Sequence, residues 1–285
     1  MKKIVEINNL DFHYSNKKQL LSGFNLLLGS GRIYTLFGEK DEGKSTLLNL
    51  ITGLSFPING NIKVLGFEPC KRNYKMLQDI FYLTEEIQNS TLSIQSFERV
   101  YVPFYPNFSS STFYKYMNDF SLDLKNERID SLSPEKRKMF IIAFGLSTNS
   151  RVILLDEPTK GLDTSAINTF RNLLSKSIND RNCILIASDL ATDLYDLPDE
   201  IMVMENHQIV LHETKENISE KFCFKVCENA ELEDSILYSE EMPEGFNQLF
   251  INKTGENSKA DIGLFYNAYL SNKEMITNVL NEQKQ

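Results

Sequence analysis

Two segments of the chain contain the residue types that nucleotide chemistry requires. The first reads Gly38-Glu39-Lys40-Asp41-Glu42-Gly43-Lys44-Ser45-Thr46, and the second is the apolar run Val152–Leu155 followed by Asp156 and Glu157. Backbone N–H groups of such a glycine-containing loop surround phosphates, while the lysine and serine add a positive charge and a Mg²⁺ ligand. Paired carboxylates at a strand end can hold Mg²⁺ and polarise a water molecule. The two segments together predict hydrolysis of a nucleotide's terminal phosphate.

The loop residues Gly38 to Thr46 are the candidate nucleotide contacts. We expect Lys44 to reach the outer phosphates, Ser45 and Asp156 to share the Mg²⁺ shell, and Glu157 to polarise the attacking water. Either segment alone has a simpler explanation, because a glycine–lysine turn can precede any helix and two acids can cap one. Their occurrence in one chain favours a functional site.

These side chains need particular elements to bring them together. Ile33–Phe37 is a β-rich apolar run that leads into the loop, and Leu47–Ile51 continues from the loop with the character of a helix. The run Val152–Leu155 suits a short buried strand of a parallel sheet, and open α/β sheets bind ligands where their strands end. The sequence therefore predicts an α/β fold with a parallel sheet.

The loop is unusually acidic. Glu39, Asp41 and Glu42 accompany a single additional lysine, Lys40, in a segment that must accept negatively charged phosphates. Like charges at short range repel, so the loop is expected to bind ATP more weakly than a neutral loop would. The alternative is that all three carboxylates face solvent and have no effect.

Composition restricts the class of protein. The chain has 285 residues, 41% of them hydrophobic, which allows one full domain and a smaller one. No stretch approaches the roughly 20 apolar residues that span a bilayer, and four scattered cysteines fit a reducing cytosol. A net charge of −9 argues against general nucleic-acid binding.

The last quarter of the chain differs from the rest in its charge and in the pattern of its apolar residues. Residues 213–285 contain 14 acidic and 7 basic side chains, which accounts for 7 of the 9 excess negative charges. Patterned runs such as Phe222–Val226 and Gly263–Leu270 occur there. We predict a first domain at residues 1–212 and a small α+β accessory domain at 213–285.

Residues Ile4 to His212 resemble the ATP-binding subunits of ABC transporters. Gly38–Thr46 corresponds to the Walker A loop of that family, Val152–Glu157 to Walker B, Gly161–Asp163 to the D-loop and Leu132–Lys136 to the signature. The resemblance implies a RecA-like P-loop NTPase fold with a helical subdomain at about 87–149, and ATP and Mg²⁺ as ligands. It also implies head-to-tail pairing, in which each ATP lies between the Walker motifs of one chain and the signature of the other.

The resemblance assigns roles to further residues. Tyr14 falls at the aromatic position that stacks on adenine, although a tyrosine at a strand edge explains it as well. Glu85 replaces the Q-loop glutamine and can still bind Mg²⁺ or its water. Ser133 is retained as a donor to the partner's γ-phosphate, and Asp163 is the D-loop acid.

Two further departures from the family pattern, in the signature and at the switch position, are expected to slow hydrolysis. The signature reads Leu-Ser-Pro-Glu-Lys, so that Glu135 stands where the family has a glycine whose backbone approaches the partner's phosphate. The bulk and negative charge of Glu135 should therefore weaken closure of the dimer on ATP. Pro134 and Glu135 also make a good helix start. The family carries a switch histidine after the strand that follows the D-loop helix, and this chain has Ser188 at that position. A serine cannot supply the reach or the possible positive charge of the imidazole. Slow hydrolysis is expected.

The two departures affect different nucleotides, because Ser188 belongs with the chain's own Walker motifs and Glu135 serves the partner's. We therefore favour a heterodimer with a better-formed second ATPase over a homodimer. Within the family, the segment Phe104–Phe108 and the C-terminal extension resemble those of Gram-positive drug and peptide exporters with a separate transmembrane permease, including the phenol-soluble-modulin type. This implies a peripheral ATPase, a translocase subunit at the cytoplasmic side of the membrane.

The alternative function is a largely non-hydrolytic ATP-binding partner that regulates such a complex. The soluble ABC proteins that act on ribosomes or DNA are a third class, but they usually have two cassettes in one chain or a long coiled-coil insert. Neither feature is present in the sequence. The expected partners are therefore membrane and ATPase subunits and not nucleic acid.

Overall fold

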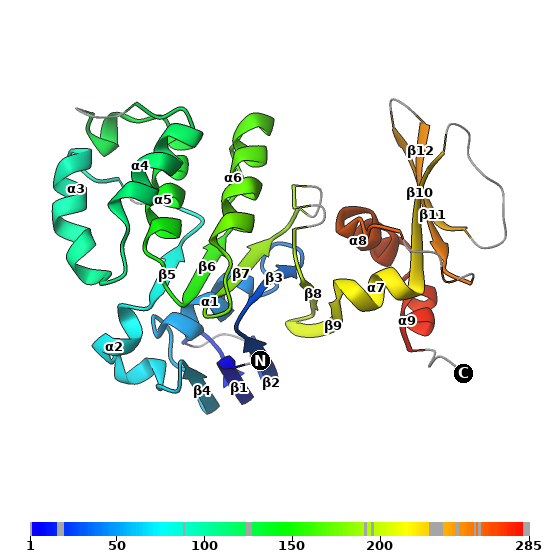
Figure 1. Ribbon diagram of the computed structural model, residues 1–285. Helices are drawn as coiled ribbons and strands as arrows, with labels where there is room; N and C mark the ends of the chain where they lie inside the picture. The colour runs from blue at the N-terminus through cyan, green and yellow to red at the C-terminus, as the bar shows by residue number, and fades with distance from the viewer. Residues whose placement is uncertain are drawn as a thin grey trace. The chain divides into compact units, whose positions relative to one another are not determined.

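The computed structural model describes most of the chain, in two compact units (Figure 1). The described residues are 2–15, 20–87, 89–123, 127–190, 193–194, 197–227, 236–242, 245–253, 255 and 258–281. The first unit comprises Met1–Asp189 and Val203–Val210, and the second comprises Leu190–Met202 and Leu211–Gln285. Strands β8 (Glu200–Glu205) and β9 (Gln208–Thr214) have residues in both units.

A largely parallel sheet positions the phosphate loop. Its strand order is β5-β6-β7-β3-β8-β9. The strands not yet given are β3 (Arg32–Phe37), β5 (Ile80–Leu83), β6 (Val152–Asp156) and β7 (Cys183–Ser188). β5, β6, β7 and β3 pair in parallel, so their carboxyl ends lie along one edge, where open α/β sheets bind ligands. The predicted α/β fold with a parallel sheet is confirmed.

The central strands are buried along their whole length. Every residue of β6 and β7 is buried, as expected for strands covered on both faces. The covering helices are α1 (Lys44–Thr52), which contacts β6, and α5 (Pro134–Ser147), which contacts β5 and α6 (Thr164–Ser177). Because α1 begins at Lys44 and β6 ends at Asp156, the packing of α1 on β6 brings the two predicted motifs together.

Side-chain caps determine where α5 and α6 begin. Ser133 Oγ accepts a hydrogen bond from Lys136 N, and Pro134 occupies the first helical position of α5. Asp163 Oδ1 accepts a hydrogen bond from Ala166 N at the start of α6. Each cap pairs one of the N–H groups that a helix leaves unsatisfied at its start. Two residues that the sequence assigns to the site therefore also have a structural role.

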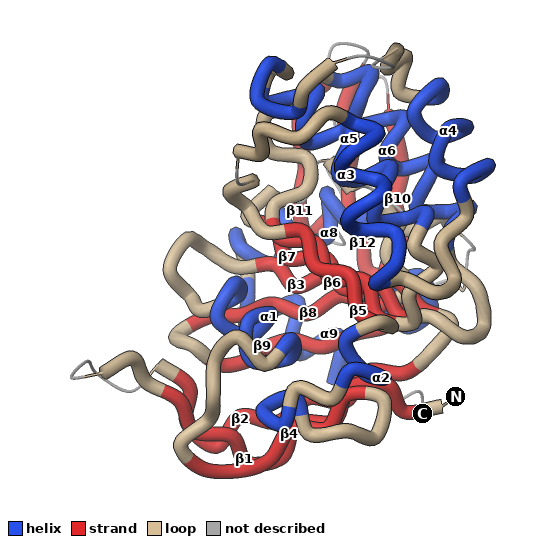
Figure 2. Tube along the Cα trace, turned by 90° about the vertical axis from the view of Figure 1, so that its left-hand side faces the viewer, coloured by secondary structure: helices blue, strands red, loops and turns tan. Residues whose placement is uncertain are grey.

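An antiparallel sheet completes the first unit and presents Tyr14 just beyond one of its strands. Its order is β2-β1-β4, with β1 at Lys3–Phe12, β2 at Leu21–Gly29 and β4 at Asn59–Val64. Figures 1 and 2 show this sheet at the end of the unit opposite to α3 (Ile94–Tyr101) and α4 (Ser110–Asp119). The shorter helical segments are 3₁₀ turns at Pro69–Lys71, Val102–Phe104 and Ile129–Ser131, and α2 at Tyr74–Leu77.

Aromatic side chains form the core of the helical region. The rings of Phe97 on α3 and Phe113 on α4 lie 5.1 and 6.0 Å from the ring of Phe144 on α5, both edge to face. Phe140 on α5 lies 5.2 Å from Phe97 and 5.8 Å from Phe113. Edge-to-face pairs add to the stability gained by burying the rings. The three helices therefore pack as one group.

The second unit contains a small sheet and three short helices in its described part. Its elements are α7 (Lys215–Lys221), β10 (Phe222–Cys227), β11 (Ile236–Met242), β12 (Gly245–Ile251), α8 (Ile262–Ser271) and α9 (Lys273–Asn281). The strands are antiparallel in the order β10-β12-β11, and the ring of Phe222 lies 5.4 Å from that of Phe265. This matches the predicted α+β character. Among the helices described in the whole chain, none combines the length and apolar character needed to cross a membrane.

Candidate nucleotide-binding site

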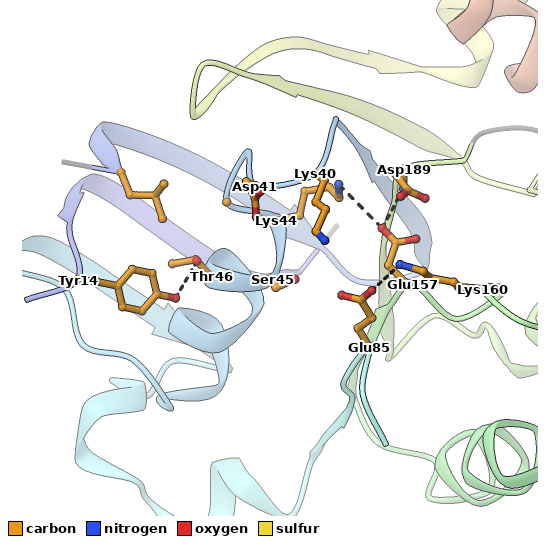
Figure 3. Close-up of a pocket in the computed structure, with 12 residues that line it drawn as sticks. Tyr14, Lys40, Asp41, Lys44, Ser45, Thr46, Glu85, Glu157, Lys160 and Asp189 are labelled. Atoms are coloured by element: carbon orange, nitrogen blue, oxygen red, sulfur yellow. Dashed lines mark hydrogen bonds and ion pairs between the residues drawn. The ribbon is translucent and has the colours of Figure 1, made fainter. Parts of the chain in front are cut away.

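The predicted motifs meet around one cavity of about 460 Å³ in the first unit (Figure 3). The residues that line it are Tyr14, Leu20, Lys40, Asp41, Gly43, Lys44, Ser45, Thr46, Glu85, Glu157, Lys160 and Asp189. Figure 3 shows Tyr14 and Thr46 on one side of the cavity and Glu85, Glu157, Lys160 and Asp189 on the other. The loop between β3 and α1 lies between these two groups, as a phosphate-binding loop must.

The loop folds tightly around the side chain of Lys44. Lys44 Nζ donates hydrogen bonds to the carbonyl oxygens of Gly38, at 2.6 Å, and Glu39, at 3.0 Å. A Cβ atom at Gly38 would lie 2.6 Å from the carbonyl oxygen of Met204, so only glycine fits there. Gly43, with φ of 107°, adopts a backbone conformation that glycine tolerates without strain. The loop is thus prearranged with its lysine at the cavity.

The three loop acids differ in where they point. Glu42 Oε2 accepts a hydrogen bond of 2.9 Å from the backbone N–H of His207, and the Nδ1–H of His207 donates to the Glu42 carbonyl oxygen at 2.8 Å. Glu39 is exposed and does not line the cavity, whereas Asp41 does, with a φ of 69° that favours glycine. Asp41 is therefore the loop acid from which repulsion of the phosphates is expected.

Replacing Asp41 with glycine is expected to tighten ATP binding by about threefold to tenfold, because it removes one like charge near the phosphates and relieves a left-handed backbone. Glu42→Gln should change the affinity less, since that carboxylate is held by His207. Isothermal titration of both variants at low salt measures the difference. Equal affinities for wild type and Asp41→Gly would contradict the repulsion.

Tyr14 forms the far side of the cavity from the acids. Its hydroxyl lies 2.9 Å from Thr46 Oγ1, and its ring packs edge to face on Phe12 at 5.0 Å between centroids. The side chain remains 43% exposed. An aromatic ring fixed at both ends and open on a face is suited to stacking on a planar base. The adenine role of Tyr14 stays a prediction.

Asp156 has the surroundings of a metal ligand. It is 2% exposed, Tyr82 donates a hydrogen bond of 3.4 Å to its Oδ2, and among the described residues Oδ1 is buried without a partner. Burial raises the pKa of this carboxyl, while a hydrogen bond from Ser45 and the charge of Lys44 lower it. A buried carboxylate oxygen without a partner, next to a serine hydroxyl, fits the oxygen ligands that Mg²⁺ prefers.

Glu85 also faces the cavity but is already paired. Lys160 Nζ donates to Glu85 Oε1 at 2.6 Å, and both side chains are about half exposed. This hydrogen bond raises the pKa of Lys160. Exposed ion pairs of this kind contribute little free energy and are readily exchanged. The carboxylate of Glu85 would therefore have to exchange Lys160 for Mg²⁺, or its bound water, in order to act as a metal ligand.

Glu157 is the most constrained residue of the site. It is 6% exposed, its φ is 46°, and its Oε1 accepts a 3.0 Å hydrogen bond from Asp189 N and lies 3.9 Å from Lys44 Nζ. Ser188 Oγ donates to Oε2 at 3.5 Å. Burial, and then the carboxyl of Asp189, raise the pKa of Glu157 to about 7, against the effect of Lys44. A carboxylate with a pKa near neutrality is well matched to accepting a proton from water.

The raised pKa of Glu157 predicts a pH-dependent stability of the nucleotide-free protein. The folded state binds this proton more tightly than the unfolded state, so the group's contribution is fully present below pH 4.5 and declines as the pH rises to about 7. The decline is at most about 3 kcal/mol. Urea unfolding should therefore show Glu157→Gln gaining stability relative to wild type across this window. A difference in free energy of unfolding between wild type and Glu157→Gln that does not change with pH would contradict the raised pKa of Glu157.

Ser133, Glu135 and Asp163 lie outside the residues that line this cavity. Glu135 Oε1 accepts a hydrogen bond of 2.8 Å from Asp163 N, which links the start of α5 to the start of α6 within one chain. Ser133 is exposed at the start of α5. The assignment of Ser133 and Glu135 to the partner's nucleotide stays a prediction.

Several residues around the site were not predicted from the sequence. Lys160 and Asp189 line the cavity, Tyr82 contacts Asp156, and Lys138 donates to the backbone that follows Glu157. Two signals were available. Asp189 directly follows the strand end at Ser188, and Lys138 is the last of three consecutive basic residues and directly precedes the apolar run Met139–Phe144.

Comparisons with known proteins agree with this geometry. Residues 21–160 match the family model described as ABC transporter. The lantibiotic transport ATP-binding protein SrtF of Streptococcus pyogenes is 27% identical over 77% of this chain and 96% of its own length. The zinc import ATP-binding protein ZnuC of Wigglesworthia glossinidia brevipalpis is 28% identical over 77% of this chain and 90% of its own length.

Solved structures show the same fold. An ATP-binding subunit of an ABC transporter matches with a TM-score of 0.68 at 19% identity, covering 75% of this chain and 91% of its own. A dimeric structure of the ATP-binding cassette MJ0796, in a post-hydrolysis state bound to ADP and Pi, matches with a TM-score of 0.64 at 20% identity. It covers 74% of this chain and 98% of its own. The RecA-like P-loop NTPase fold predicted from the sequence is confirmed.

Proposed function

Because this chain carries an ABC transporter ATP-binding domain, we propose that it hydrolyses MgATP to power efflux of a drug or a cytolytic peptide through a separate membrane subunit. ATP hydrolysis is general for this family, and its ATP-binding domains dimerise and work with a membrane subunit. One observation carries the proposal: Lys44, Ser45 and Glu157 line a single cavity.

The chain's own residues divide the chemistry between them. Lys44, already directed into the cavity by the loop carbonyls, offsets the charge of the outer phosphates. Ser45, Asp156 and Glu85 would hold Mg²⁺, which when bound neutralises phosphate oxygens. Glu157 accepts the proton of the attacking water at its carboxylate, and Asp189 N and Lys44 fix the orientation of that carboxylate.

Hydrolysis is proposed to be slow in the isolated chain. Ser188 is buried against Glu157 at the position of the switch histidine, and a serine hydroxyl brings no positive charge to the phosphate. Glu135 adds a negative charge beside Ser133, which is proposed to serve the partner's nucleotide. A heterodimer would have one of these defects in each site and a homodimer both, so we favour the heterodimer.

The direction of transport and the cargo rest on resemblance. SrtF is named for lantibiotic transport, which supports a peptide cargo, whereas ZnuC is named for zinc import. We propose efflux, with a phenol-soluble-modulin type of peptide as one cargo. The domain at 1–212 would perform the ATPase cycle at the cytoplasmic face of the membrane, and residues 213–285 would form an accessory domain.

Copurification from membranes tests this function. The tagged full chain is expected to bring down a polytopic membrane protein and a second ATPase, and the complex should hydrolyse ATP faster than the chain alone. Vigorous hydrolysis by the isolated chain would contradict the heterodimer, and recovery of RNA or DNA in place of a membrane protein would contradict the transport role.

A largely non-hydrolytic regulatory subunit is the second candidate. It is favoured by Ser188 at the switch position, where a hydroxyl brings no positive charge to the phosphate. The two functions differ in their need for Glu157. A complex whose hydrolysis is unaffected by Glu157→Gln in this chain would support the regulatory role.

A further inference from the structure

A buried lysine holds the backbone immediately after the predicted catalytic glutamate. Lys138, on the first turns of α5, is 7% exposed and does not line the nucleotide cavity. Its Nζ donates hydrogen bonds to the carbonyl oxygens of Glu157, at 2.9 Å, and Lys160, at 2.7 Å. One amine therefore links both ends of the turn 157–160 to a helix of the core.

Packing alone does not explain a lysine at this position. Its neighbours Met139 and Phe140 are apolar and buried, and an apolar side chain would avoid the cost of removing an amine from water. Burial lowers the pKa of Lys138, and the charges of Glu85 and Glu157 raise it. The N–H groups donate to the two carbonyls in either protonation state. The two hydrogen bonds are thus what the lysine contributes.

The turn that Lys138 holds has a backbone that needs support. Glu157 has a φ of 46°, in the left-handed region that a side chain with a Cβ disfavours. Its N–H donates to Ala187 O at 2.9 Å, and its carbonyl accepts from Lys138 and, at 3.3 Å, from Lys160 N. Such conformations persist only where surrounding contacts determine them. Lys138 is the side chain that contacts this carbonyl within the described structure.

We propose that Lys138 is a positioning residue for ATP hydrolysis, which keeps Glu157 directed into the cavity by fixing the carbonyl groups of Glu157 and Lys160. The same contact orients Lys160, whose side chain pairs with Glu85 on the same side of the cavity. This inference rests on the proposed hydrolytic function. Small displacements of a reacting group reduce rates strongly, so loss of the contact affects turnover more than binding.

Lys138→Met tests the inference, because methionine keeps the length of the side chain and removes its donors. Ile142→Val is the matched control: it weakens the same helix at a fully buried position and leaves the Lys138 amine, which makes both hydrogen bonds to the turn, in place. Amide hydrogen exchange of the nucleotide-free full chain, followed in peptides that cover residues 157–163, reports on the turn without any need for hydrolysis. Steady-state kinetics of the purified complex report on kcat and KM separately.

Lys138→Met is expected to speed exchange in 157–163 by about tenfold or more and to lower kcat by about tenfold, with KM within about threefold of wild type. Ile142→Val should change neither. Unchanged exchange, or unchanged kcat in a folded variant, overturns the inference. Should Lys138→Met not unfold cooperatively, Lys138→Gln, which keeps a donor on a shorter chain, is judged by the same two readouts.

The exchange and turnover measurements distinguish failure of the proposed hydrolytic function from failure of the positioning role of Lys138. Faster exchange in Lys138→Met, combined with no turnover by the wild-type complex, contradicts the hydrolytic function and supports the fixing of the turn. Turnover by wild type, with no effect of Lys138→Met on exchange or kcat, contradicts the positioning role alone.

Discussion

Glu157→Gln is expected to lower ATP hydrolysis by the assembled complex by about 100-fold or more, while ATP still binds. Glutamine preserves the shape of the side chain and the 3.0 Å contact with Asp189 N, but it cannot accept the proton of the attacking water. The loss therefore falls on kcat. Steady-state phosphate release and equilibrium ATP binding, measured on the same preparation, separate turnover from affinity.

Glu68→Gln provides the control for this substitution. Glu68 is exposed, pairs with Lys71 on the surface and does not line the cavity, so its variant should hydrolyse ATP as wild type does. Hydrolysis by the Glu157 variant at the wild-type rate would show that another group accepts the proton, or that the second ATPase performs all turnover. Assay with the second ATPase inactivated distinguishes these two explanations.

Lys44→Met should weaken ATP binding by about 100-fold or more, because the only buried cation of the cavity lining in the described structure is lost. The carbonyls of Gly38 and Glu39 would also lose their donor, so the loop would no longer be held in its present form. Equilibrium dialysis with radiolabelled ATP measures the change.

Lys40→Met gives the comparison within the same loop. Lys40 lines the cavity but is exposed, and an exposed charge contributes less than a buried one, so the expected loss is about threefold. If the two lysine variants weakened binding equally, the loop would act only through its total charge, and the specific placement of Lys44 would have no importance.

Much of the nucleotide site could be predicted from the sequence because its determinants are local. A strand, a glycine-containing loop and a helix follow one another from Ile33 to Ile51, and Val152–Glu157 is a buried strand with two acids at its end. Parallel strands bring such ends to one edge, so the meeting of Lys44, Asp156 and Glu157 follows from topology. The structure confirms that arrangement of elements.

Contacts between distant segments could not be predicted in the same way. The orientation of Glu42 depends on His207, which lies in the turn between β8 and β9, and the Glu135 side chain reaches Asp163 on another helix. The sequence gives the type of each residue, but the direction of its side chain depends on the packing of elements far apart in the chain. The positive φ of Glu157 is likewise a product of tertiary contacts.

The division of the chain into two compact units also could not be read fully from the sequence. The change in composition near His212 led to the predicted division between residues 212 and 213, which stays a prediction. The compact units group Leu190–Met202 with Leu211–Gln285 and leave Val203–Val210 with the first unit. Because the chain crosses three times between the units, no single change of composition along the sequence marks their boundary.

The proposed function requires this chain's own cavity to bind MgATP and to hydrolyse it in the assembled complex. Single-turnover quench-flow with γ-labelled ATP, using the copurified complex with its second ATPase inactivated, tests it most directly. We expect slow release of labelled phosphate by wild type and stable retention of intact ATP by Glu157→Gln. Failure of the wild-type chain to retain or cleave any ATP under these conditions would contradict it.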